Sequence, residues 1–102
     1  MKNRAVKIDD AENGQSFLDV SDLEPPEPLV RVLARIDSLE SGQYLHVRHH
    51  REPCLLYPNL EKRGFDYLSC GNDAYFHIFI WRKDDAEAER AVRAAIGELC
   101  QG

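Results

Sequence analysis

The chain has 102 residues, a formal net charge of -5 and 43% hydrophobic residues. This length fits one domain with a single modest core. The acidic balance argues against a broad nucleic-acid-binding surface, which depends on positive charge, and no apolar run is long enough to span a membrane. An odd number of cysteines and the lack of a recognisable secretory leader predict reduced thiols and a cytoplasmic location.

The first half of the chain predicts a tail, a strand, a helix and a second strand. Met1–Gly14 is polar and charged, as is typical of a flexible tail. A strand is predicted over Gln15–Val20 and a helix over Pro26–Glu40, followed by a strand over Tyr44–His49. The helix assignment depends on apolar residues at helical spacing, namely Leu29, Val32, Leu33 and Ile36.

The second half predicts a helix, a hairpin and a last helix. The helix covers Pro53–Arg63, although Pro58 makes its start uncertain, and Gly64 closes it. Strands over Phe65–Cys70 and Ala74–Arg82 flank a turn at residues 71–73. An amphipathic helix is predicted over Ala86–Cys100, with Asp84 or Asp85 as its cap.

This order of elements predicts an α/β fold of the two-layer sandwich type, βαβαββ with an added C-terminal helix. Right-handed crossovers place the two internal helices on the same face of the sheet. The other face then needs a separate cover.

A proline-rich junction carries a resemblance to a known family. The matching residues are Leu18-Asp19, Leu23-Glu24-Pro25-Pro26-Glu27-Pro28, Gly42 and the Leu45-His46-Val47 strand. With them, residues 15–82 resemble the TusA-like (SirA-like) sulfur-carrier superfamily. The resemblance implies a four-stranded mixed sheet of strand order 1-2-4-3.

The same junction departs from the superfamily at one position. Members carry a Cys-Pro-x-Pro motif, and Pro26-Glu27-Pro28 is similar to its second part, whereas the motif cysteine would fall at Pro25. A persulfide cannot form on proline. The chain, with its Arg51-Glu52-Pro53-Cys54 segment, therefore resembles an uncharacterised branch that lacks the motif cysteine. Pro25, Pro26 and Pro28 remain candidate binding residues at the helix start.

Cys54 is the candidate reactive thiol. It follows Pro53 at the predicted start of the second helix, where the helix dipole and Arg51 would favour a thiolate. Parallel strands bring both helix starts to one end of the sheet, so Cys54 would lie near the position of the missing cysteine. The alternative is a small packing residue, which is the commoner role of a cysteine without a known reaction.

Four histidines form a second candidate group. In the implied strand order His46 and His77 lie on neighbouring strands and face the bare side of the sheet. Two or three imidazoles can bind a transition metal, with His49 and His50 nearby. Solvated polar residues on an open sheet face are the simpler explanation, and we assign no metal site.

Aromatic residues gather on that same bare face. Alternation places Tyr75, His77, Phe79 and Trp81 there, joined by Phe17, Tyr44 and Tyr67. Three covers are open: the C-terminal helix, a second copy of the chain in a homodimer, or stacked bases of single-stranded nucleic acid. The net charge disfavours the third, and the helix is preferred.

The sequence therefore predicts a small non-enzymatic module that binds a protein partner or a small ligand. The candidate binding residues are Pro25, Pro26, Pro28, Arg51, His46, His77, Tyr75, Phe79 and Trp81. No glycine loop for nucleotides, zinc-knuckle spacing or serine-hydrolase motif is present, so no cofactor is expected. The alternative function is a thiol-based sulfur carrier or redox accessory that uses Cys54.

Overall fold

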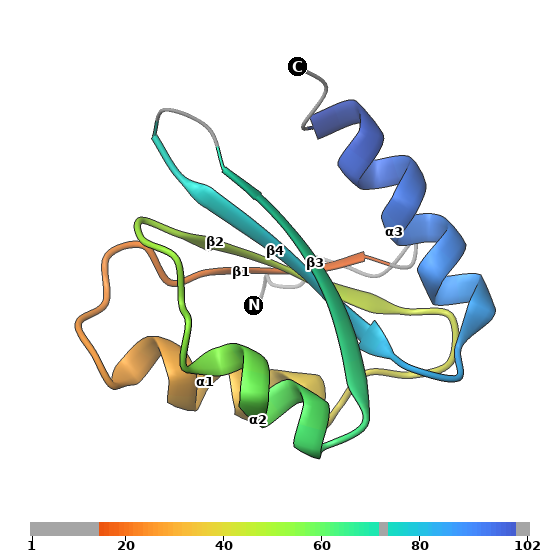
Figure 1. The fold of residues 1–102 in the computed structure, drawn as a ribbon, viewed down its shortest axis with the longest axis horizontal. Coiled ribbons are helices and arrows are strands. Elements are labelled where there is room, and N and C mark those ends of the chain that lie inside the picture. The colour runs from red at the N-terminus through yellow and green to blue at the C-terminus, as the bar shows by residue number, and fades with distance from the viewer. Residues whose placement is uncertain (1–14, 72–73, 100–102) are drawn as a thin grey trace, which may run out of the picture.

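The computed structural model describes residues 15–71 and 74–99. Within them four strands and three helices follow the order βαβαββα (Figure 1). The predicted tail over residues 1–14, most of the hairpin turn and Cys100 lie outside the described residues. The elements are β1 (Gln15–Asp19), α1 (Glu27–Ile36), β2 (Tyr44–His49), α2 (Leu56–Lys62), β3 (Phe65–Gly71), β4 (Phe76–Arg82) and α3 (Ala86–Leu99).

The strands form one mixed sheet in the order β1-β2-β4-β3, which confirms the predicted topology. β1 and β2 run parallel, and β4 runs antiparallel to both of its neighbours. Two parallel strands need a crossover connection, and α1 supplies it. The carboxyl ends of β1 and β2 therefore meet at one edge of the sheet.

The main core lies between the sheet and the pair α1 and α2, which share one face (Figure 1). From α1, Val32 and Ile36 are buried, as the helical spacing predicts. Leu56 and Leu60 of α2 are buried beside them. The sheet supplies alternate residues of its two central strands, namely Leu45, Val47, Ile78 and Ile80.

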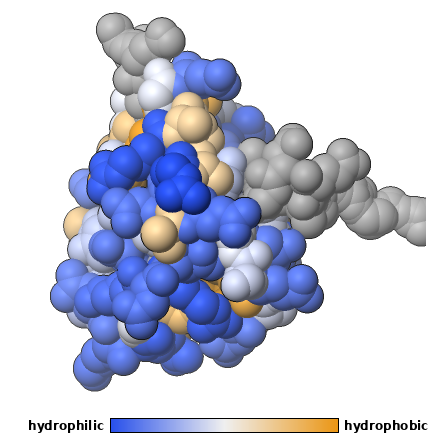
Figure 2. All heavy atoms as spheres, turned by 90° about the vertical axis from the view of Figure 1, so that its right-hand side faces the viewer, coloured by the Kyte–Doolittle hydropathy of each residue, from blue (hydrophilic) through white to orange (hydrophobic). Residues whose placement is uncertain are grey.

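A second, smaller core lies on the opposite face, where α3 covers the sheet. Ala88 and Val92 of α3 are buried against Tyr44, Phe79 and Trp81. The side of the molecule that carries α3 is largely hydrophilic, with a few apolar residues among the polar ones (Figure 2). The helix thus turns its apolar stripe inward and covers the aromatic face from within the same chain.

Asp85 fixes the start of α3, as one of the two capping alternatives predicts. Its carboxylate accepts the N–H of Ala88 at 3.0 Å and the N–H of Gly42 at 2.7 Å. Both hydrogen bonds lower the pKa of Asp85, and the bond from Gly42 contributes more than the bond from Ala88. Gly42 has a φ of 81°, a conformation that glycine adopts without strain. One side chain therefore caps the helix and ties it to the turn before β2.

Several predicted boundaries are wrong. α1 ends at Ile36 because the following hydrogen bonds span three residues instead of four. The N–H of Ser38 donates to the carbonyl of Arg35, and the N–H of Leu39 donates to the carbonyl of Ile36. α2 begins at Leu56 rather than at Pro53. A start at Pro53 would put Pro58 in the helix interior, where it lacks the N–H for an intrahelical bond, whereas in the first turn no such bond is needed.

Tyr67 is the one aromatic residue placed on the wrong face by the sequence. The register pairs it with Ile80, which faces α1 and α2. Its ring stacks on Tyr57 of α2, with centroids 4.5 Å apart and planes 12° from parallel. Directly paired residues share a face of the sheet, so the pairing decides the side that Tyr67 takes.

Two further observations concern the predicted absence of a membrane span and the predicted redox state of the cysteines. None of the described helices has the length and apolar character needed to cross a bilayer. Cys70, on β3, stands in a disulfide bond, so the prediction of reduced thiols does not hold for it.

Candidate functional site

Two connecting segments lie at the edge where β1 and β2 end. One leads from β1 to α1 over residues 20–26, and the other leads from β2 to α2 over residues 50–55. Ligands of open α/β sheets bind outside the carboxyl ends of parallel strands, between such connections. This edge is therefore the first place to look for a site.

Prolines build the first connection. Pro26 is the N-cap of α1 and makes no side-chain cap, and the Pro25–Pro26 peptide bond is cis. Pro28 follows in the first turn and is buried. Because a proline ring fixes φ, the start of α1 has little freedom to move.

The end of β2 and the second connection together supply His49, Arg51 and Cys54. The backbone N–H of Arg51 donates to Nδ1 of His49 at 3.3 Å. Cys54 follows in a turn in which its N–H donates to the carbonyl of Glu52 at 3.0 Å. Its side chain is exposed and its thiol is free.

Cys54 does not open the second helix, contrary to the sequence prediction. The N-cap of α2 is Leu55, so Cys54 lies one residue before the cap. The helix therefore gives no support for an activated thiolate at Cys54. What the structure does bring together is Pro25 and Cys54, which belong to the two connections and line one cavity.

That cavity has a volume of about 340 Å³ and lies between the two connections. Most of its lining is apolar, and its buried part includes Val32, Val47 and Leu56. Four side chains with polar groups join this lining, all from the second connection or the strand end before it. The full lining is Pro25, Pro26, Pro28, Leu29, Val32, Val47, His49, Arg51, Glu52, Pro53, Cys54, Leu55 and Leu56.

His49 is the buried polar group of the cavity and is only 5% exposed. Burial, with smaller contributions from His50 and Arg51, lowers its pKa, so the imidazole is neutral at neutral pH. Since Nδ1 accepts a hydrogen bond, we assign the proton to Nε2. The sequence analysis did not choose His49, although alternation along β2 puts it on the face of Leu45 and Val47.

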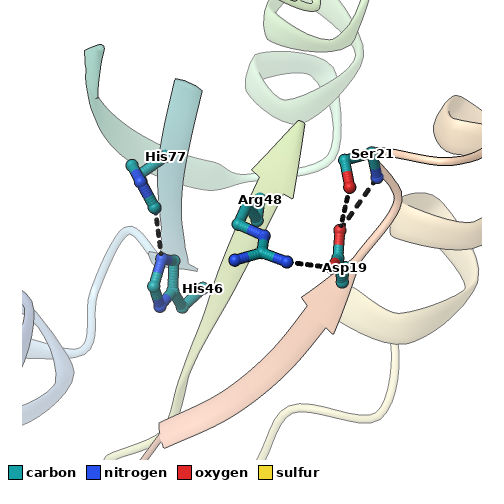
Figure 3. A network of polar contacts seen from close by, with 5 residues as sticks. All are labelled: Asp19, Ser21, His46, Arg48 and His77. Carbon is teal, nitrogen blue, oxygen red and sulfur yellow. Dashed lines mark hydrogen bonds and ion pairs between the residues drawn. The ribbon is translucent and has the colours of Figure 1, made fainter. Parts of the chain in front are cut away.

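A second polar group lies on the other face of the sheet (Figure 3). Nε2 of His46 and Nδ1 of His77 are 3.0 Å apart, and the ring of His46 stacks on Phe79. Beside them, Arg48 donates to the carboxylate of Asp19 at 2.7 Å. The guanidinium of Arg48 also lies over the ring of Tyr75, 4.3 Å from its centroid. Within residues 15–71 and 74–99, no cluster of three or more His, Cys, Asp or Glu side chains could hold a metal ion.

Residues 17–82 match the family model described as "Uncharacterized conserved protein (DUF2249)". The chain belongs to the DUF2249 family. No curated protein and no solved structure shows a significant match. The family region contains the whole sheet from Phe17 onward, both connections and every residue of the cavity lining, whereas α3 lies beyond it.

Two candidate binding residues of this DUF2249 chain are buried beneath α3. Phe79 and Trp81 are each 1% exposed in the second core. They therefore pack in the second core and stabilise the fold, and a role for them in binding stays a prediction. The C-terminal helix, the cover preferred from the sequence, lies over this part of the aromatic face.

We expect the protein to lose stability in mild acid because of its histidines. Burial, then His77, then Arg48 lower the pKa of His46 to about 4, and burial followed by Arg48 lowers that of His77. Between this value and the ordinary one of 6.5, the unfolded chain binds protons that the folded chain does not. Stability is therefore complete above the ordinary pKa and falls as the pH drops toward the folded pKa.

The measurement is urea unfolding between about pH 7 and about pH 5, a window in which carboxylates contribute little. Because the ring of His46 is partly exposed, we expect a loss of roughly 1–2 kcal/mol from it. His46→Phe keeps a ring against Phe79 and removes the titration, so its loss over this window should be smaller. An equal loss in the variant would contradict the assignment to His46.

Proposed function

We propose that this DUF2249 protein is a small, non-enzymatic, cytoplasmic module that binds a small ligand in the cavity between its two connections. The observation that carries the proposal is the cavity itself, with about 340 Å³ of apolar-lined space. Small-molecule sites have volumes of this order and combine apolar walls with a few polar groups. The polar groups here are His49, Arg51, Glu52 and Cys54.

Three further points support a small ligand at this edge. The cavity lies at the carboxyl ends of β1 and β2, where α/β folds bind their ligands. Its walls are rigid at Pro25, Pro26 and Pro28, so little ordering is needed when a ligand binds. The resemblance to TusA-like proteins supports the same place, since their motif cysteine corresponds to Pro25.

The test is amide chemical-shift mapping with a set of small apolar fragments. We expect saturable shifts at Leu29, Val32 and Val47, and none at the far end of α3. A fragment set that shifts no lining residue would reject the proposal. Shifts that spread evenly over the surface would reject it as well, since they indicate non-specific contact.

The second candidate function is a thiol-based sulfur carrier, and the exposed free thiol of Cys54 in the cavity lining favours it. In such a step the Cys54 thiolate attacks the outer sulfur of a persulfide donor. A new S–S bond forms at Cys54 while the donor's S–S bond breaks. The donor leaves as a thiolate, and no net oxidation occurs.

Mass spectrometry separates the two candidates. After incubation with a persulfide donor, a sulfur-carrier function predicts one added sulfur atom at Cys54 and none in Cys54→Ser. No addition in the native chain, together with fragment binding in the cavity, favours the binding module alone.

A further inference from the structure

We propose that the ligand of this cavity is an organic acid, with its carboxylate held by Arg51 and His49 and its apolar body against Val32, Val47 and Leu56. The inference rests on the proposed function and narrows it to one class of ligand.

Arg51 supplies the positive charge. Its side chain is exposed in the cavity lining and makes no ion pair or side-chain hydrogen bond within the described part of the chain. Arg48, in contrast, is held by Asp19, and Arg31 by Glu27. A guanidinium without a carboxylate partner is available to form the paired N–H bonds that suit a ligand carboxylate.

His49 supplies a neutral donor beside that charge. Its Nδ1 is occupied by the N–H of Arg51, which leaves the proton on Nε2. No described residue gives Nε2 a partner, although the side chain is more than nine-tenths buried. Nε2 is not one of the fully buried unpartnered atoms, so it is open to water, and a ligand oxygen would accept its N–H in place of water.

Glu52 is the opposing charge in the lining, and its side chain makes a hydrogen bond outside the cavity. Its carboxylate accepts the hydroxyl of Tyr57 at 3.4 Å, and Tyr57 is not part of the lining. This neutral hydroxyl gives the Glu52 carboxylate a partner on α2 but leaves its negative charge in the lining, so Arg51 has to outweigh it for an anion to bind. The chain as a whole carries a charge of -5, so attraction of an anion to this site has to come from local groups.

The experiment compares hexanoate with hexanamide, which have the same length and differ in charge. Titrations followed by amide shifts should show hexanoate binding about tenfold more tightly, as expected for a charge-assisted pair. Arg51→Gln should abolish this preference for hexanoate over hexanamide. Arg63→Gln is the matched control, because Arg63 is exposed at the end of α2 and outside the lining.

Each outcome bears on one claim. Equal affinities of the two probes at the lining residues overturn the organic-acid class and leave the cavity as a binding site. An equal effect of Arg63→Gln and Arg51→Gln also overturns it, because the preference would then be a general charge effect. If neither probe shifts a lining residue, the proposed function itself fails.

Discussion

Replacing Val92 with aspartate is expected to lower the free energy of unfolding by about 3–5 kcal/mol. Val92 of α3 is fully buried in the second core, against Phe79 and Trp81. A carboxylate there loses its water and meets apolar atoms in place of a partner. Urea unfolding of the variant beside the native protein measures the loss.

Ala94→Asp is the matched control for this prediction. Ala94 is an exposed residue of α3, two positions from Val92, so the variant carries the same charge and helix propensity without burial. It should cost no more than about 1 kcal/mol. Equal losses in the two variants would show that α3 does not pack on the sheet. Deletion of residues 86–102 should in turn expose Tyr44 and Trp81 and cause aggregation.

The order of elements and the sheet topology were accessible from the sequence because each depends on a regular pattern. Apolar residues at helical spacing marked α1 and α3, and alternation marked β2 and β4. Right-handed crossover then left one placement for α1 and α2. The strand order itself came from the resemblance, since periodicity does not say which strands pair.

Positions that depend on register or on a single proline were harder to predict. Tyr67 lies opposite Ile80, and only the pairing of β3 with β4 reveals its side of the sheet. With Pro58 in its first turn, α2 begins at Leu56 rather than at the predicted Pro53, so Cys54 lies outside the helix. A shift of a few residues at a helix start leaves the fold unchanged. It removes the helix dipole as the reason to expect a thiolate at Cys54.

The candidate site was predicted in part. Pro25, Pro26, Pro28, Arg51 and Cys54 were chosen from the sequence, and all of them line the cavity. His49 was overlooked as a lining residue because its role as a neutral polar group of the cavity depends on its burial and on the hydrogen bond from Arg51. Neither property is visible in a sequence, although the alternation of β2 already indicated its face.

Filling the cavity from one side should abolish ligand binding without unfolding the protein. Leu29 of α1 is partly exposed, packs against the main core and lines the cavity, so Leu29→Trp adds an indole at the cavity wall. We expect the affinity for hexanoate to fall by at least about tenfold, because the ring takes the room of the ligand's apolar body. Amide-shift titration measures the affinity, and urea unfolding verifies that the variant is folded.

Val30→Trp is the control, since Val30 is the next residue of the same helix, is 55% exposed and lies outside the lining. It introduces the same side chain on the solvent side of α1 and should bind hexanoate like the native protein. If Leu29→Trp also binds normally, the ligand does not occupy this cavity. If both variants lose binding, the effect passes through α1 as a whole, and the shape of the cavity is not the cause. Loss in Leu29→Trp alone is the result that places the ligand between the prolines of the first connection and the thiol of the second.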